Sequence, residues 1–321
     1  MNIVSLFSGA GGLDLGLIQE GHEIIWANDI DPDAIKTYRH NIGRHAILAD
    51  IGMLTDEELP VAEVVVGGFP CQGFSLANMK RSGSDSRNIL YLQFLRVVNN
   101  TKPKYFLAEN VRGILSIDAG KAIEKIIKEF SSAGYRVKCK LFNVADFGVP
   151  QSRLRVIIAG TRRDLPPEAD FHFPEPTHGK NYKPLLKAWR SITEGIAGIP
   201  DPEFYPNAMP NQIYSKYKVT NRNFTGHRTT DPNKPSPTIL ARGNGGGGVC
   251  AIQHPNNHRR MSVRESAAIQ TFPNDFVFFG SMNSQYRQVG NAVPVQFGAA
   301  LGRALNDIYL RLSLNDVEGR T

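Results

Sequence analysis

The sequence predicts an α/β protein with a doubly wound, mostly parallel sheet and a smaller, irregular second part. Short apolar segments that end in glycine or polar residues alternate with amphipathic segments, which is typical of β-turn-α units. The length of 321 residues exceeds the usual size of one domain. A stretch rich in Pro, Gly, Asn and Thr, residues 177–264, has poor helical periodicity. These observations favour one large α/β domain with a second lobe.

The N-terminus predicts the first β-turn-α unit. Residues 3–7 form the expected strand, residues 8–12 the glycine turn, and residues 13–19 the helix. Asp14 stands where a dinucleotide fingerprint requires a third glycine, and its carboxylate would repel a phosphate but could accept a hydrogen bond from an amino group. Asp29 ends the next strand, 20 residues after Gly9, where an acid can bind a ribose diol. We therefore expect an adenosine ligand without phosphates.

Cys71 follows a buried strand, residues 64–66, at a turn. Gly67 and Gly68 let the backbone turn sharply and approach a ligand, and Pro70 fixes φ just before the thiol. A thiol placed there can be exposed and activated. The alternative is a buried structural cysteine, which is common for free cysteines in strands.

Two further segments carry charged residues at strand ends. The strand over residues 105–111 ends in Glu109 and Asn110 and precedes a helix over residues 119–132, so Glu109 is expected at the same carboxyl edge as Cys71. A helix cap or a surface pair is the alternative for Glu109 and Asn110. Residues 147–160 place Arg153 and Arg155 on one face of a strand, because side chains alternate with period two. A solvated edge is the alternative for these arginines.

Taken in order, these segments resemble the motifs of the C5-cytosine DNA methyltransferases, and closely the compact bacterial enzymes of restriction-modification systems. The resemblance covers nearly the whole chain, with a small departure at Asn88, where the family usually has glycine. Its motifs are residues 7–12, 70–72, 109–111, 151–155, Arg264 and Glu265 within 261–273, and 290–294. The resemblance implies the fold of the S-adenosylmethionine-dependent methyltransferases.

The resemblance also implies the chemistry and its residues. C5 of cytosine is too weak a nucleophile, so Cys71 would add to C6 of a flipped cytosine while Glu109 protonates or hydrogen-bonds N3. Arg155 would hold the cytosine O2, with Arg153 supporting it. S-adenosylmethionine would donate the methyl group, and no metal is required. Phe7 would stack near adenine, Asp29 would bind the ribose, and Asn291 with Val293 would lie near the methionine end. The full implied cofactor set is Phe7, Ser8, Gly9, Ala10, Gly11, Gly12, Asp29, Ile30, Asp50, Ile51, Pro70, Asn291 and Val293.

Charge independently points to a nucleic acid partner. Residues 177–264 hold 13 basic and 4 acidic residues, a net charge of +9, whereas each of the flanking segments has a net charge of −1. This segment is therefore the expected face for double-stranded DNA. We expect a catalytic and cofactor domain over residues 1–175 plus 285–321, and a target-recognition domain over 176–284. The expected DNA-binding residues are Gln72, Ser75, Lys80, Arg81 and Arg87 in a closing loop, and Thr238, Ile239 and Arg242.

Composition sets the remaining expectations. No apolar run approaches the roughly 18 residues that cross a bilayer, and no signal segment is evident, so a cytoplasmic location is expected. The three cysteines are scattered without zinc spacing. A monomer is expected, with a cognate restriction endonuclease that shares the site without needing to bind.

Three other functions remain open. A nicotinamide-dependent oxidoreductase is disfavoured by the missing third glycine and the basic segment. A DNA-binding regulator without catalysis would be expected to lack Cys71 or Glu109, and both are present. A tRNA cytosine methyltransferase would use the same chemistry. The recognised DNA sequence does not follow from one chain, because base contacts depend on loop geometry.

Overall fold

The fold comes from a computed structural model of the chain. It describes residues 1–70, 89–180, 185–216, 230–241, 252–256 and 259–318. Cys71 and the expected closing loop therefore lie outside the described residues, as do Arg242 and the glycine run over 243–248.

A seven-stranded sheet forms the centre of the larger part, in the order β3-β2-β1-β4-β5-β8-β6. Five neighbouring strands, β3 to β5, are parallel, and β8 is antiparallel to both of its neighbours. The mostly parallel sheet predicted from the sequence is confirmed. Its strands are β1 (Asn2–Leu6), β2 (Glu23–Asp29), β3 (Ala46–Leu48), β4 (Val64–Gly67), β5 (Tyr105–Val111), β6 (Tyr135–Asn143) and β8 (Leu154–Arg162).

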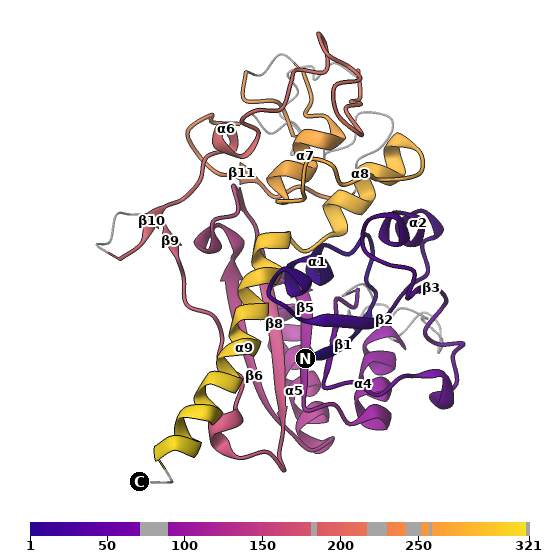
Figure 1. Cartoon of the computed structure of the whole chain (residues 1–321), viewed down its shortest axis with the longest axis vertical. Helices are drawn as coiled ribbons and strands as arrows, with labels where there is room; N and C mark the ends of the chain where they lie inside the picture. The colour runs from indigo at the N-terminus through magenta and orange to yellow at the C-terminus, as the bar shows by residue number, and fades with distance from the viewer. Residues whose placement is uncertain (71–88, 181–184, 217–229, 242–251, 257–258, 319–321) are drawn as a thin grey trace.

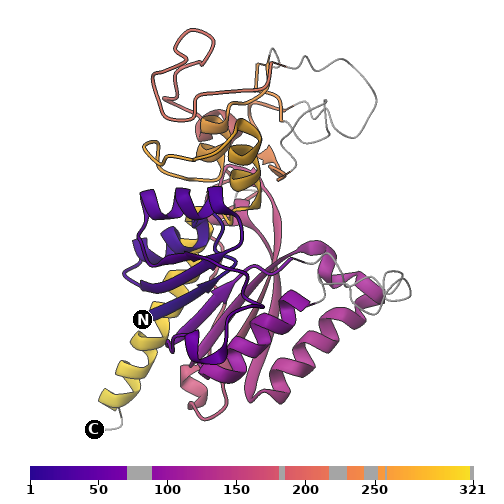
Figure 2. The ribbon, with the colours of Figure 1, turned by 90° about the vertical axis from the view of Figure 1, so that its right-hand side faces the viewer.

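Helices cover both faces of this sheet, as a doubly wound fold requires (Figure 1, Figure 2). Alternate residues of each buried strand enter two separate cores: Tyr105 and Leu107 pack on one face, and Phe106 and Ala108 on the other. The first core takes side chains from α1 (Gly12–Gln19), α2 (Pro32–Asn41) and α9 (Val295–Glu318). The second takes them from α4 (Ile89–Thr101) and α5 (Lys121–Ser132).

The C-terminal helix α9 returns to the N-terminal half of the chain. It crosses α1 so closely that a Cβ atom on Gly16 would lie 2.3 Å from the carbonyl oxygen of Val295. Val295, Leu301 and Ile308 are buried. Packing therefore makes residues from both ends of the chain one folded unit.

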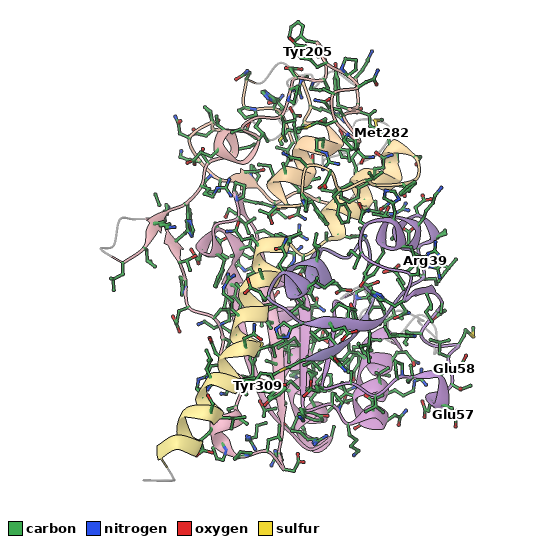
Figure 3. The ribbon with its side chains drawn as sticks, in the orientation of Figure 1. Arg39, Glu57, Glu58, Tyr205, Met282 and Tyr309 are labelled. Carbon is green, nitrogen blue, oxygen red and sulfur yellow. The ribbon has the colours of Figure 1, made fainter. Side chains whose placement is uncertain are left out.

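The second part lies beyond the carboxyl ends of the parallel strands (Figure 1). Its core includes Ile192, Ile239, Met261 and Phe276. Figure 3 places Tyr205 at its outer end and Glu57 and Glu58 at the periphery of the sheet part. Its regular elements are short: β9 (His178–Gly179), β10 (Lys187–Ala188), α6 (Ile192–Gly195), β11 (Ser236–Pro237), α7 (Val263–Ile269) and α8 (Met282–Asn291). β11 pairs with β7 (Gln151–Ser152), the short strand directly before β8. This pairing joins the second part to the sheet part.

Some predicted boundaries differ from those observed. The helix expected from residue 119 begins at Lys121, because Asp118 and Ala119 have left-handed φ values of 51° and 55°. Arg153 lies between β7 and β8 rather than in a strand. The remaining short helices are η1 (Asp56–Glu58), η2 (Arg112–Leu115), η3 (Ile117–Gly120), η4 (Val144–Phe147) and η5 (Pro167–Ala169).

Candidate active site

The loop between β1 and α1 is held against the end of β2. Ser8 N donates to the carbonyl of Asn28 at 2.9 Å, and Gly9 N donates to Oδ2 of Asp29 at 2.8 Å. Phe7 has a φ of 55°, a left-handed conformation that aromatic residues rarely adopt. Such strain is often found where a loop is shaped for a ligand.

Asp29 keeps acceptor capacity for a further ligand. Besides Gly9 N, its carboxylate accepts the Asp31 N–H at 2.9 Å. Burial raises the pKa of Asp29, and the backbone donors oppose this shift. Two carboxylate oxygens offer about four lone-pair sites, so these bonds leave room for ribose hydroxyls.

Asp14 does not face a ligand. Its side chain is 1% exposed, and Ser5 Oγ and Tyr38 Oη donate to its two oxygens at 2.7 and 2.8 Å. Burial raises the pKa of this carboxyl to about 6, although both hydroxyl donors lower it. The expectation that Asp14 accepts from a ligand amino group is wrong, because its carboxylate points into the core between β1 and α2.

The segment after α8 meets the glycine loop. A Cβ atom on Gly12 would lie 2.3 Å from the carbonyl oxygen of Val293, so only glycine permits this approach. Val293 is 8% exposed, whereas Asn291 is exposed. The two segments named for cofactor binding at opposite ends of the chain are thus side by side.

The other expected cofactor residues follow neighbouring strands. Ile30, 68% exposed, follows β2, and Asp50, also exposed, follows β3. Ile51 is buried. The ends of β1, β2 and β3 therefore present Phe7, Asp29 with Ile30, and Asp50 along one edge of the sheet.

Glu109 and Arg155 form an ion pair at the same edge. The antiparallel register pairs Val111 of β5 with Arg155 of β8, and Arg155 Nε lies 2.5 Å from Glu109 Oε1. Both side chains are largely buried, with exposed fractions of 13% for Glu109 and 10% for Arg155. Arg155 Nη1 also donates to the carbonyl of Leu154 at 2.8 Å. The guanidinium thereby balances the charge of the carboxylate.

The chain leading to Cys71 passes against this pair. Asn110 Nδ2 donates to the carbonyl of Phe69 at 2.9 Å. A Cβ atom on Gly68 would lie 3.0 Å from Glu109 Oε2, so a larger residue there would press on the carboxylate. Pro70, exposed, is the last described residue before Cys71.

Arg153 has a different environment from Arg155. It is 1% exposed and donates Nη1 to the carbonyl of Ile239 at 2.8 Å. Its Nη2 donates to the carbonyls of Gly290 at 3.0 Å and Ala292 at 3.2 Å. Burial lowers the pKa of Arg153, Arg155 lowers it further, and Glu109 opposes the shift. The alternative of a solvated edge is wrong for both arginines, because both are buried.

Thr238 and Ile239 are docked on the segment that contains Arg153. Thr238 Oγ1 donates to the carbonyl of Ser152, and Ile239 N donates to Gln151 Oε1, each at 2.9 Å. Ile239 is 4% exposed and Thr238 is half-buried. Sequence reasoning gave no separate role to Gln151 or Asn110, although both lie inside quoted motifs, and no pattern identified the buried Gln270 described below.

The remaining predicted site residues are outside the part of the chain that the structure describes. They are Cys71, Gln72, Ser75, Lys80, Arg81, Arg87 and Arg242. Among the described residues, no cluster of three or more His, Cys, Asp or Glu side chains is suited to hold a metal ion.

Comparison with known proteins identifies the family. The model of the C-5 cytosine-specific DNA methylases matches residues 1–307. The chain belongs to this family. It is a DNA cytosine-5 methyltransferase, and the family implies S-adenosylmethionine as methyl donor and DNA as substrate. In the described residues, no helix is long and apolar enough to span a membrane.

Curated relatives share most of their length with this methyltransferase. The type II methyltransferase M.NgoFVII of Neisseria gonorrhoeae is 39% identical over 334 residues, covering 96% of this chain and 87% of the relative. M.FnuDI of Fusobacterium nucleatum is 36% identical, covering 96% and 94%.

Solved structures show the same fold. A DNA modification methyltransferase encoded within an E. coli prophage superposes with a TM-score of 0.74 at 24% identity, covering 96% of this chain and 99% of that one. The S. pombe Dnmt2 methyltransferase superposes with a TM-score of 0.71 at 22% identity, covering 98% and 99%. The predicted methyltransferase fold is confirmed.

Proposed function

We propose that Cys71 is the nucleophile that adds to C6 of a cytosine flipped out of duplex DNA. The observation that carries this proposal is the bond from Asn110 Nδ2 to the carbonyl of Phe69, two residues before the thiol. It ties the segment that leads to the thiol to the end of β5, where Glu109 is paired with Arg155 of β8. Flipping exposes the face of the ring at a cost of about a few kcal/mol.

In the proposed reaction, the cytosine ring first binds the Cys71 sulfur and releases it again after the methyl transfer. The Cys71 sulfur bonds to C6 while Glu109 protonates or hydrogen-bonds N3, and electron density moves to C5. Bound S-adenosylmethionine supplies the methyl group. Loss of the C5 proton to a base, return of any N3 proton to Glu109 and expulsion of the Cys71 thiolate restore the C5–C6 double bond and a neutral ring. Arg155 holds O2 of the ring, and Arg153 supports it by fixing the surrounding backbone.

The cofactor is proposed to lie along the ends of β1, β2 and β3. The acceptor capacity of Asp29 and the open space around Gly9, where a Cβ atom would meet nothing within 4 Å, fit an adenosine group. Phe7 stacks near adenine, Asp29 binds the ribose, and Asp50 with Ile51 lies at the adenine edge. Asn291 and Val293 lie near the methionine end. The other members are Ser8, Gly9, Ala10, Gly11, Gly12, Ile30 and Pro70.

Residues 176–284 are proposed as the target-recognition domain, and residues 1–175 with 285–321 as the catalytic domain. The helix α8 spans the boundary at 284 and therefore continues from one proposed domain into the other. The +9 charge of residues 177–264 supports a DNA-facing role. Proposed contacts are Gln72, Ser75, Lys80, Arg81, Arg87, Thr238, Ile239 and Arg242.

The relatives are named type II methyltransferases, which supports a role in restriction-modification. We propose that the enzyme acts as a monomer on a short specific sequence and without a metal, in the bacterial cytoplasm and at the nucleoid through DNA. A cognate endonuclease would share the site without needing to bind this protein.

A mechanism-based trap tests the nucleophile. A duplex with 5-fluorocytosine at the target, which bisulfite sequencing of modified DNA identifies, should form a covalent complex through Cys71, because fluorine does not leave C5 as a proton does. Cys71→Ser should abolish both trapping and methyl transfer while cofactor and DNA still bind. Trapping through Cys139 or Cys250, or substantial turnover by the serine variant, would contradict the assignment.

Exchange of residues 177–258 tests the recognition domain. Replacing them with the corresponding segment of a relative that has another specificity should move methylation to the relative's site. Bisulfite sequencing reads the outcome. An active chimera that still modifies the original sequence would place recognition elsewhere.

A further inference from the structure

Two buried amide side chains, those of Gln151 and Gln270, connect Ile239 in the proposed target-recognition domain to Ala292 and Val293. We call these last two residues the cofactor segment. Gln270 is 0% exposed, and its Oε1 accepts from Gln151 Nε2 at 2.7 Å. Its Nε2 donates to the carbonyls of Val289 at 2.7 Å and Ala292 at 2.9 Å. Every hydrogen of the Gln270 amide is therefore bonded, which buried polar groups require.

On one side this pair reaches Ile239. Gln151 Oε1 accepts the Ile239 N–H at 2.9 Å, while Arg153 donates to the Ile239 carbonyl at 2.8 Å. Both backbone groups of Ile239 are thus held by side chains. The next residue, Leu240, lies so close to Gly290 that a Cβ atom there would be 2.4 Å from the Leu240 carbonyl.

On the other side the pair reaches the cofactor loop. Ala292 precedes Val293, whose carbonyl lies against Gly12. The backbone of Gln270 also accepts the N–H of Val295 at 3.1 Å, at the start of α9. A continuous path of short contacts therefore runs from Ile239 through Gln151 and Gln270 to Gly12.

The chemistry of the path fixes both amides in one orientation. Gln151 must turn its oxygen to the Ile239 N–H and its NH₂ to Gln270, because a flipped amide would oppose two oxygens and two donors. Gln270 is fixed in the same way by two carbonyls. A pair locked at both ends can set a distance as well as stabilise the fold.

We propose that Gln270 is a positioning residue that sets the spacing between Ile239, one of the proposed DNA contacts, and the cofactor segment at Ala292 and Val293. The inference rests on the proposed function, since it takes these two segments as the base and cofactor sides of the site. Loss of the Gln270 amide should therefore slow methyl transfer in the ternary complex more than it weakens binding of either ligand.

The test compares Gln270→Met with Gln288→Met. Gln288 is also buried in this region. Its side chain accepts from Thr37 Oγ1 and donates to the carbonyl of Phe279 and to Ser284 Oγ, and among the described residues that side chain has no bond to Ile239, Ala292 or Gly12. Single-turnover methylation is measured with saturating S-adenosylmethionine and a duplex that carries the mapped site. Gln270→Met should lower this rate about 10- to 100-fold, because small misplacements of reacting groups have effects of that size. Gln288→Met should stay within about 2-fold of wild type.

Two further readouts separate positioning from general destabilisation. Binding of S-adenosylhomocysteine and of the duplex to Gln270→Met should change less than about 3-fold, so that the loss is in the rate alone. The double variant Gln151→Met with Gln270→Met should be no slower than the slower single variant, because both break one path. Where Gln270→Met fails to bind S-adenosylhomocysteine, Gln151→Met carries the same rate test.

Equal rates for the Gln270 and Gln288 variants, or multiplied losses in the double variant, would overturn the inference. If the wild-type enzyme is active, either of these results overturns the role of Gln270 but does not contradict the proposed function. The proposed function fails separately, when the wild-type enzyme forms no Cys71 complex with 5-fluorocytosine.

Discussion

The backbone at the carboxyl edge of the sheet and the backbone of the smaller, irregular part are stabilised by different hydrogen bonds. At the edge, Glu109 and Arg155 are brought together by the register of β5 and β8, so a regular ladder of backbone bonds fixes the pair. In the smaller part, Arg264 is 0% exposed and donates to the carbonyls of Pro210, Pro273 and Phe276. There, side chains supply the donors that an irregular backbone lacks.

The same contrast separates the two arginines of one motif. Arg155 balances a carboxylate, whereas Arg153 donates to three carbonyls and reaches both parts of the molecule. Burial lowers the pKa of Arg264, which also binds carbonyls, to about 10. Buried guanidinium groups of this kind act as structural crosslinks, and Arg155 is the arginine for which we propose a part in the chemistry.

The largest effect is expected from Glu109→Gln. The proposed interaction of Glu109 with N3 strengthens as the ring takes up Cys71, so its loss should lower the single-turnover rate about 100-fold or more and weaken DNA binding much less. The exposed Glu124→Gln in α5 is the control and should keep the wild-type rate. Parallel losses of rate and affinity would make Glu109 a residue of ground-state binding.

Arg153→Met tests the crosslink. It removes the side-chain donor of the Ile239 and Gly290 carbonyls, while the Ala292 carbonyl still accepts from Gln270, and it should lower the free energy of unfolding by about 4 kcal/mol. Arg303→Met breaks a half-exposed pair with Glu20 and should cost less than about 1 kcal/mol. Urea titration measures both. Similar losses for the two variants would mean that burial of Arg153 gives no advantage.

The raised pKa of Asp14 predicts that the free energy of unfolding depends on pH. Its pKa is raised from 3.8 to about 6, so the folded state binds the proton more tightly than the unfolded state. The contribution to stability is full below about pH 4 and is lost as the pH rises through 6, by at most about 3 kcal/mol. Asp14→Asn should remove this slope from unfolding measurements between pH 4 and 7.

The exposed Asp164→Asn is the control for this slope. The hydrogen bond from Arg162 lowers the pKa of Asp164, which is the opposite direction from the shift of Asp14. An unchanged slope in Asp14→Asn would show that another group titrates.

The smallest effect is expected from Arg242→Ala in the recognition segment. Loss of a guanine contact should relax one position of the site by about 1 to 3 kcal/mol. Loss of a phosphate contact should instead weaken all sequences alike and flatten the salt dependence. Binding to duplexes with single substitutions at each position, at two salt concentrations, separates these roles. No change in either quantity would remove Arg242 from the interface.

The sequence by itself determined the positions of the strand ends and the residues they carry. Alternation with period two and glycine turns are local signals, so the strand over 105–111 was predicted with its observed bounds, and Asp29 and Glu109 were placed at the carboxyl edge. The predicted helix start at residue 119 was wrong, because Asp118 and Ala119 adopt a left-handed conformation that their residue types do not predict.

Only the tertiary structure decided the partners of the buried polar side chains. Arg153 binds carbonyls 86 and 137 residues away, and Gln270 accepts from an amide 119 residues away. Asp14 turned inward because Ser5 and Tyr38 offer hydroxyl donors in the core. A buried polar group takes the donors and acceptors that the packed chain brings to it, and no local pattern in the sequence encodes that choice.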